Sequence, residues 1–183
     1  MKLSFIIELS MKRLHWSKEE VKVISNFRID ERLIHGQVIA TWLKTLGVTH
    51  LIVASDEVAN DKVRQTTLKM VLPGDLKCLI KDVDQVAEIL MDERAKDMKI
   101  MLITGSPQDA LRIVEKVPEI REVNLANYGS ITKSEVKNKK TISKMVYLDD
   151  DDVVSTNKLN EKLHCVYTQK TPSDLKKIIN IIK

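Results

Sequence analysis

One short segment of the 183-residue chain concentrates the side chains that are able to do chemistry. It reads Arg28-Ile29-Asp30-Glu31-Arg32-Leu33-Ile34-His35-Gly36-Gln37-Val38. Two arginines, two carboxylates and a histidine fall within eight of these residues, where an apolar run gives way to a helical pattern. Guanidinium groups bind phosphoryl oxygens in a planar fork, and a neutral histidine beside them is a nucleophile. The segment therefore suggests phosphate chemistry.

His35 is the candidate nucleophile. Arg32 precedes it by three residues, a spacing that places both side chains on one side of a helical turn. Nearby guanidinium charge disfavours the imidazolium form and keeps the ring neutral. Arg28 and Asp30 are expected on the loop that leads into this turn, where Asp30 would hold an arginine or fix the ring tautomer. A phosphoryl group accepted on His35 fits these features.

A second interpretation explains the same charges without a ligand. Arg28, Asp30, Glu31 and Arg32 could form surface ion pairs, which are common and contribute little. The first turn of a helix offers free N–H groups that attract an anion, which supports the phosphate interpretation. The local chemistry alone favours neither.

The elements that position this segment alternate along the chain from residue 21 onward. Strands are predicted at residues 21–24, 51–54, 77–80, 99–103, 123–126 and 166–167, with a further apolar run at 145–148. Helices are predicted at 34–46, where Gly47 ends the helix, at 58–71 and 84–91, and from Ser106 to before Pro118. Another begins at Asp152 or Ser155, and a closing helix capped at 173–174 runs to residue 181.

Repeated strand–helix–strand units with apolar strands predict an α/β fold, with a mostly parallel central sheet, right-handed crossovers and helices on both faces. In such sheets, ligands bind beyond the carboxyl ends of the strands. Four segments are expected there, namely 27–35, 55–61, 104–106 and 124–129. The charged segment is thus placed at the edge where a site is expected.

The composition limits the class of protein. With 43% apolar and 31% charged residues, the chain is an ordinary globular protein with one core. A net charge of +4 permits an anionic partner without requiring one, and 4% aromatic residues argue against a nucleic-acid stacking surface. Cys78 and Cys165 lack metal-type spacing, which favours a reducing cytoplasm, and no apolar run approaches the roughly 20 residues of a membrane span.

Other candidate sites are weaker. Gly36 has no glycine partners at the spacing of a nucleotide-binding loop. Asp56, Glu57 and Asp61 could bind Mg²⁺ as in a phospho-aspartate receiver, but helix capping is the preferred explanation. Neither cysteine has a histidine nearby, so a thiol nucleophile is not expected.

Two further groups of polar residues have structural explanations. The amides near Asn124, Asn127 and Gly129 would contact a phosphate or form a local turn, and both interpretations stay open. His50 and His164 lack nearby ligand partners and are expected to be structural.

The segment from Arg28 to Val38, followed by Trp42, resembles the signature of the enzyme IIB components of the mannose/fructose/sorbose family. These proteins belong to the bacterial phosphoenolpyruvate-dependent sugar phosphotransferase system. Further stretches match the family pattern in order, at residues 56–61, 69–73, 106–110, 123–125 and 171–174. The resemblance implies one IIB domain over residues 21–183, with a three-layer α/β/α fold, preceded by an extension of unknown role at 1–20.

The resemblance also implies a reaction. His35 would accept a phosphoryl group at Nδ1 from a phosphorylated IIA component and donate it to a sugar, as a protein-phosphohistidine–sugar phosphotransferase. Arg32 would steady the phosphoryl oxygens and Asp30 would belong to the same active loop. The remaining phosphate or active-loop residues would be Arg28, Gly36, Gln37 and Asn124.

The implied partners are IIA, the membrane components IIC and IID, and the sugar, with a homo-oligomer as one option and no nucleic acid. IIA is expected on a separate chain, and the protein is expected in the cytoplasm at the inner face of the membrane. No metal or cofactor is expected if arginine and N–H groups carry the phosphoryl charge.

The alternative function is that of a non-catalytic relative, whose phosphorylated His35 only signals to a regulator. The loop at 127–130 departs from a common glycine-rich version.

Overall fold

The computed structural model describes residues 24–131 and 139–182, without the side chains of Gln37 and Ile39. The predicted extension at 1–20 and most of the first predicted strand lie outside these ranges. In the described part, the main sheet has the order β3-β2-β4-β1-β5-β8-β9. Its strands are β1 (Ile24–Asp30), β2 (His50–Ala54), β3 (Lys77–Lys81), β4 (Ile100–Thr104), β5 (Glu122–Asn127), β8 (Cys165–Thr168) and β9 (Lys177–Ile179).

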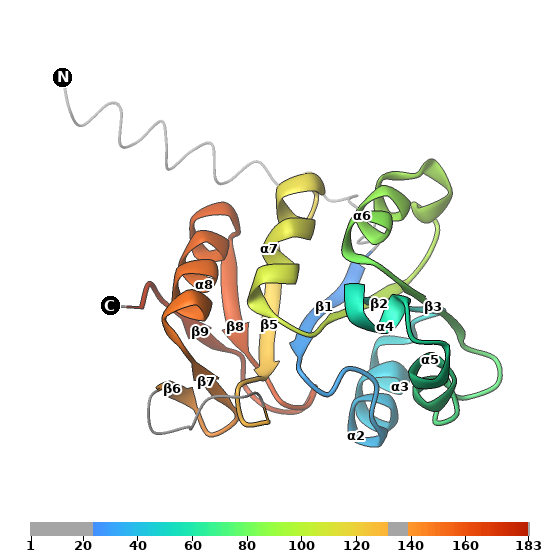
Figure 1. Ribbon diagram of the computed structural model, residues 1–183, viewed down its shortest axis with the longest axis horizontal. Coiled ribbons are helices and arrows are strands. Elements are labelled where there is room, and N and C mark those ends of the chain that lie inside the picture. Colours follow the sequence, from blue (N-terminus) through green and yellow to red (C-terminus); the bar gives the residue numbers. More distant parts are fainter. Residues whose placement is uncertain (1–23, 132–138, 183) are drawn as a thin grey trace.

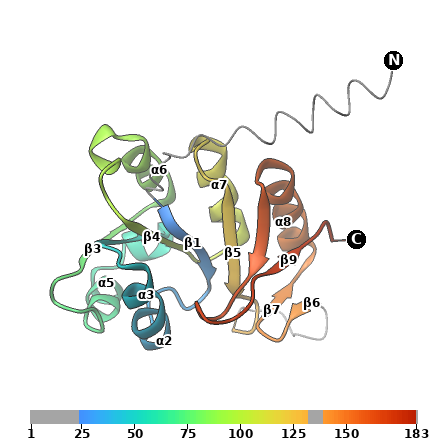
Figure 2. The same ribbon diagram turned by 180° about the vertical axis from the view of Figure 1, so that it is seen from behind.

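Helices cover both faces of this sheet and make the three layers that the sequence predicts. Figure 1 shows α6 (Val83–Met91), α7 (Pro107–Lys116) and α8 (Asp150–Lys162) over one face. Seen from behind in Figure 2, the other face carries α5 (Lys62–Lys69) and a helical segment formed by α2 (Gly36–Val38), a π-helical turn (Ile39–Leu43) and α3 (Lys44–Leu46). Short helices α4 (Asp56–Ala59) and η2 (Glu93–Ala95) complete this set.

Two apolar cores lie on opposite faces of the sheet. Strand residues alternate between them, so that Ile52 faces one core while Leu51 and Val53 face the other. In β1 the same alternation sends Phe27 and Ile29 into the larger core, beneath α6, α7 and α8. The polar residues between them therefore point toward the face that carries α2 and α3, and this alternation determines where the site forms.

The sheet is parallel in every pairing except the last. Strands β1, β2, β3, β4, β5 and β8 pair in parallel, and β9 pairs antiparallel with β8. A separate hairpin, formed by β6 (Lys140–Ser143) and β7 (Val146–Leu148), lies beside the end of β5 (Figure 1). The predicted fold class is confirmed, and the carboxyl ends of the parallel strands form the edge at which a ligand is expected.

Several helix ends follow the predicted capping chemistry. Ser106 accepts a hydrogen bond from the N–H of Asp109, and Pro107 is the first residue of α7. Asp61 caps α5 by accepting from the N–H of Arg64. Gly47 adopts φ 57° where α3 ends, the left-handed conformation in which glycine is favoured.

The structure corrects four element boundaries. Among the described residues the first strand covers Ile24–Asp30 and therefore continues past its predicted end at residue 24, because its polar residues pair with one another and remain in the strand. The predicted helix at 58–71 is two helices, since the cap at Asp61 starts a new one. The helix predicted from Ile34 begins at Gly36. Helix α8 begins at Asp150 because Asp149 and Asp152 form a capping box.

The predicted closing helix at 174–181 is wrong. Asp174 does not cap a helix; its carboxylate accepts from the N–H and the hydroxyl of Thr171 and closes a turn. The chain then enters β9, which covers the edge of β8. β-branched Ile178 and Ile179 suit a strand, and pairing with β8 outweighs the local helical pattern.

Candidate functional site

A buried ion pair in β1 forms the centre of the site. The Asp30 Oδ2 atom accepts from Arg28 Nε at 3.0 Å and from Arg28 Nη2 at 2.8 Å. Arg28 is 2% exposed and Asp30 is fully buried. Both residues therefore lie in the strand and not on the loop where the sequence places them. The interpretation of this pair as a surface ion pair is wrong.

His35 lies against the same carboxylate. Its Nε2 atom is 3.1 Å from Asp30 Oδ2, and its side chain is 13% exposed. An ionised carboxylate only accepts hydrogen bonds, so we assign the ring proton to Nε2. Nδ1 then holds the free lone pair and is the nucleophilic atom of the ring.

The carboxylate of Asp30 is held in the ionised state. Burial by itself raises its pKa, but the hydrogen bond from His35, the charge of Arg28 and a hydrogen bond from Asn127 outweigh burial and leave the pKa lowered. Its second oxygen accepts from Asn127 Nδ2 at 3.0 Å and from the N–H of Arg32 at 3.1 Å. Burial lowers the pKa of the Arg28 guanidinium and Asp30 opposes this effect, so the two charges stabilise each other.

Apolar anchors fix the loop between Asp30 and His35. Leu33 and Ile34 are 3% and 4% exposed and belong to the core beneath α2 and α3. Leu33 has φ 55°, a left-handed conformation that costs a non-glycine residue about 1–2 kcal/mol. Its N–H donates to the carbonyl of Asp30 at 2.9 Å, and its side chain packs over Gly105. The loop is thus held in a strained shape next to the histidine.

Arg32 and Gly36 flank His35 at the surface. The guanidinium of Arg32 is exposed and forms no ion pair or hydrogen bond with the residues that the structure describes. A Cβ added to Gly36 would meet no atom within 4 Å, so the fold does not require glycine there. The side chain of Gln37, also predicted in the site, lies outside the described part of the chain.

The loop after β8 closes the polar face behind the ion pair. Its Gln169 carbonyl accepts from Asn124 Nδ2 at 2.9 Å and from Arg28 Nη1 at 3.4 Å. Trp42 Nε1 donates to the carbonyl of Lys170 at 3.0 Å, and the Trp42 ring centre is 5.8 Å from the guanidinium carbon of Arg28. This loop, β1 and the helical segment after His35 are thereby joined.

The predicted amide contacts to a phosphate are engaged within the protein. Asn124 is fully buried, and its Oδ1 atom accepts from the N–H of Gln169 at 3.0 Å. Asn127 donates to Asp30, and the N–H of Gly129 donates to Glu31. Asn124 therefore holds the loop after β8 and does not present its amide to a ligand.

The receiver-like alternative finds no support at Asp56. Its carboxylate accepts from the N–H of Val83 at 2.9 Å and from Arg112 at 2.6 Å. These contacts lower the pKa of Asp56, the Val83 N–H most strongly. No cluster of three or more His, Cys, Asp or Glu side chains in the described residues could hold a metal ion. Asp56 ties α4 to the neighbouring helices.

Two further residues lie outside this group: His50, which is predicted to be structural, and Cys78, which is not expected to act as a nucleophile. His50 Nδ1 lies 2.8 Å from the hydroxyl of Thr49, and burial together with Lys77 lowers its pKa. Burial raises the pKa of the Cys78 thiol to about 11, so it is a poor nucleophile.

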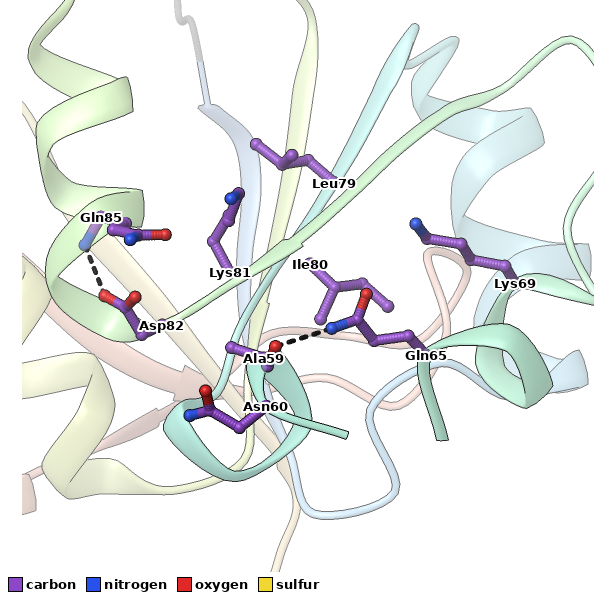
Figure 3. A pocket seen from close by; sticks show the side chains of 9 residues that line it. All are labelled: Ala59, Asn60, Gln65, Lys69, Leu79, Ile80, Lys81, Asp82 and Gln85. Carbon is purple, nitrogen blue, oxygen red and sulfur yellow. Dashed lines mark hydrogen bonds between the residues drawn. The ribbon is translucent and has the colours of Figure 1, made fainter. Parts of the chain in front are cut away.

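A separate cavity of about 370 Å³ lies over strand β3 and contains none of the residues predicted for phosphoryl chemistry. Figure 3 shows its polar lining, in which Gln65 donates to the carbonyl of Ala59 and Asp82 accepts from the N–H of Gln85. Apolar Leu79 contributes to the lining from the strand itself. This cavity is therefore distinct from the His35 site.

Comparison with known proteins identifies the family of the chain. A family model described as "PTS system sorbose subfamily IIB component" matches residues 24–183. The chain belongs to this family. It is thus a phosphotransferase component, and the system in which it acts transfers phosphoryl groups during sugar uptake.

Individual relatives agree with this assignment. A probable phosphotransferase enzyme IIB component from Streptococcus pyogenes serotype M6 is 36% identical over 155 residues, which are 84% of this chain and 95% of that protein. A mannose-specific EIIAB component from Escherichia coli K12 is 33% identical over 161 residues, which are 87% of this chain and 48% of that protein.

A solved structure confirms the fold. The IIB domain of the sorbose permease from Klebsiella pneumoniae has a TM-score of 0.75 at 27% identity, covering 84% of this chain and 91% of that one. The family implies partners of the IIA and IIC/IID types in general. Among the described residues, no helix has both the length and the apolar character needed to cross a membrane.

Three residues have roles in the site that their sequence context does not predict. Trp42 appeared only as part of the resemblance, Asn127 as one of several candidate amides, and Glu31 as a surface charge. Their partners are Lys170, Asp30 and the main chain at 129–131, respectively. Most of these contacts join residues about 100 positions apart, which local spacing does not reveal.

The first prediction concerns the contribution of the buried Arg28–Asp30 ion pair to stability. Asp30→Asn is expected to lower the free energy of unfolding at neutral pH by about 3–5 kcal/mol, because it leaves Arg28 charged and buried without its partner. The pKa of Asp30 is lowered in the folded protein. Ionised Asp30 therefore contributes to stability above its unfolded pKa of about 3.9, and this contribution is lost as the pH falls from there through the lower pKa of the folded protein. Urea unfolding from neutral pH into acid measures both effects.

Asp92→Asn is the matched control, because Asp92 forms an ion pair with Arg94 that is exposed to solvent. Its unfolding midpoint is expected to stay near that of the wild type. A difference between Asp30→Asn and the wild type that stays constant into acid would contradict an ionic origin.

Proposed function

We propose that His35 accepts the phosphoryl group from a phosphorylated IIA component at Nδ1 and passes it to the sugar delivered by IIC and IID. The observation that carries this proposal is the contact between His35 Nε2 and Asp30 Oδ2 at 3.1 Å. It directs the ring proton to Nε2 and leaves Nδ1 as the nucleophile. The protein is then a protein-phosphohistidine–sugar phosphotransferase that works at the cytoplasmic face of the membrane.

The transfer follows from this arrangement. The Nδ1 lone pair attacks phosphorus in line, the new N–P bond forms, and the electron pair of the broken bond returns to the donor histidine of IIA. The proton stays on Nε2, so the phosphorylated ring carries a positive charge beside the Asp30 carboxylate. A positively charged ring is a good leaving group, and the phosphohistidine remains a donor for the sugar hydroxyl.

The neighbouring residues have supporting roles in the proposed transfer. Arg32 binds the phosphoryl oxygens in this proposal, which is supported by its exposed guanidinium and by the lack of an ion pair or hydrogen bond to that group among the described residues. Gly36 leaves open space beside His35 for the phosphoryl group or for the donor protein. Arg28 acts through Asp30, with which it is paired, and Asn124 supports both through the loop after β8. Gln37 completes the signature at the start of the helix.

The first functional prediction concerns the acceptor. Phosphorylated IIA is expected to label this protein with a phosphate that is labile in acid and stable in base, and His35→Ala is expected to abolish the label. Radiolabel transfer followed by acid and base treatment measures this. His50→Ala is the control and is expected to keep full labelling, because His50 lies outside the site. Full labelling of His35→Ala would refute the assignment.

The second functional prediction separates chemistry from folding. Arg32→Ala is expected to change the free energy of unfolding by less than about 0.5 kcal/mol, because the side chain is exposed. Its phosphoryl-transfer rate is expected to fall at least about tenfold, since a donor to the developing charge is lost. Rapid-quench transfer assays and urea unfolding measure the two quantities.

Arg94→Ala is the control for removing a surface guanidinium and is expected to change neither quantity appreciably. Parallel losses of stability and transfer in Arg32→Ala would assign the arginine a structural role instead.

A further inference from the structure

The Glu31 carboxylate accepts several hydrogen bonds that have no role in the proposed reaction. Its Oε2 atom accepts from the N–H of Gly129 at 3.0 Å. Its Oε1 atom accepts from the N–H groups of Ser130 and Ile131, each at 3.0 Å, and from the Ser130 hydroxyl at 2.8 Å. Three successive main-chain N–H groups thus converge on one carboxylate, an arrangement that binds anions.

The 129–131 loop is braced on its other side by the hairpin β6–β7. The N–H of Tyr128 donates to the carbonyl of Met145, and the N–H of Tyr147 donates to the carbonyl of Tyr128, each at 2.9 Å. Gly129 has φ 84°, and a Cβ at this residue would lie 1.8 Å from the Tyr147 carbonyl oxygen. The Gly129 end of the loop is therefore fixed against the hairpin, and Glu31 joins the active loop, residues 30–35, to the 129–131 loop.

The contacts continue from Glu31 to the histidine. The N–H of Glu31 donates to the carbonyl of Asn127 at 2.9 Å, and the Asn127 side chain donates to Asp30. Asp30 in turn holds His35. A movement of Glu31 relative to the loop after β5 would therefore displace Asn127 and Asp30, the two hydrogen-bonded residues that orient the His35 ring.

We propose that Glu31 is a positioning residue for phosphoryl transfer, which holds the 129–131 loop to the active loop and thereby fixes Asp30 and His35. The inference rests on the proposed function for its kinetic consequence. Ile131 is 67% exposed, so core packing does not hold this end of the loop. The carboxylate supplies the restraint, and it also puts a negative charge near a site that receives an anion.

These two properties of Glu31 predict opposite effects on the rate. If positioning dominates, removal of the carboxylate slows transfer. If Glu31 mainly repels the incoming phosphoryl group, its removal speeds transfer. The sign of the change therefore tests the inference directly.

The experiment compares Glu31→Ala and Glu31→Gln with the wild type in single-turnover transfer from phosphorylated IIA. Glu31→Ala is expected to lower the saturating rate about 10- to 100-fold, because small misplacements of reacting groups are costly, with the half-saturating IIA concentration little changed. Glu31→Gln keeps one acceptor oxygen but turns an NH₂ group toward the Gly129 N–H, so an intermediate rate is expected. It also tests the inference if the alanine variant folds poorly.

Two NMR readouts accompany the kinetics. Amide exchange at Gly129, Ser130 and Ile131 is expected to rise about tenfold or more in Glu31→Ala, and the ring nitrogen signals of His35 are expected to shift. Glu57→Ala and Glu57→Gln are the controls, since Glu57 pairs with Arg64 at the surface. These controls are expected to alter neither the rate nor the spectra.

Faster amide exchange with unchanged transfer and unchanged His35 signals would overturn the inference, as would a faster rate. A wild-type protein that takes no label on His35 would instead overturn the proposed function. In that case the ring signals still decide the positioning role: a shift in both Glu31 variants supports it and no shift refutes it.

Discussion

The carboxylate of Asp30 is buried completely, and the rest of the site is arranged to satisfy it. A buried charge is very unfavourable unless it is paired and fully hydrogen-bonded. Its donors are Arg28 in the same strand, the Arg32 N–H and His35 in the active loop, and Asn127 at the end of β5. These groups meet only when β1, β5 and the loop have assembled. The requirement to satisfy one carboxylate therefore couples the geometry of His35 to the folding of the sheet centre.

The same coupling explains how the histidine would serve as the relay in the proposed function. Asp30 is ionised because His35, Arg28 and Asn127 outweigh the effect of burial on its pKa. In the proposed reaction an ionised partner fixes the proton on Nε2 before the donor arrives, so no proton has to move to or from the ring when it accepts the phosphoryl group. The strained conformation of Leu33, anchored in the core, holds the loop in the shape that this contact requires. A preorganised ring reduces the reorganisation that each of the two transfers would otherwise need.

Local chemistry predicts some of these features and not others. The caps at Ser106 and Asp61 and the helix end at Gly47 depend on neighbouring residues only, and the structure confirms them. The carboxyl end of β1 could not be predicted in the same way, because charged residues in a buried strand violate the apolar pattern unless their partners are known. The helix predicted at the end of the chain is wrong for the same reason, because the strand β9 found there is stabilised by its pairing with β8. The resemblance identified the reaction, but the contacts that orient its groups come from distant strands.

Two arginines four residues apart illustrate how position determines the role of identical side chains. Arg28 is on an inward-facing position of β1, where Asp30 neutralises its charge and its guanidinium lies over the ring of Trp42. Arg32 follows the end of that strand, three residues before His35 in the sequence, and its side chain is exposed. A permanently paired charge stabilises structure and responds little to a ligand, whereas an unpaired one gains most when a phosphoryl group arrives. Because the strand ends between them, one positive charge is used by the fold, and the other would be available for the phosphoryl group in the proposed reaction.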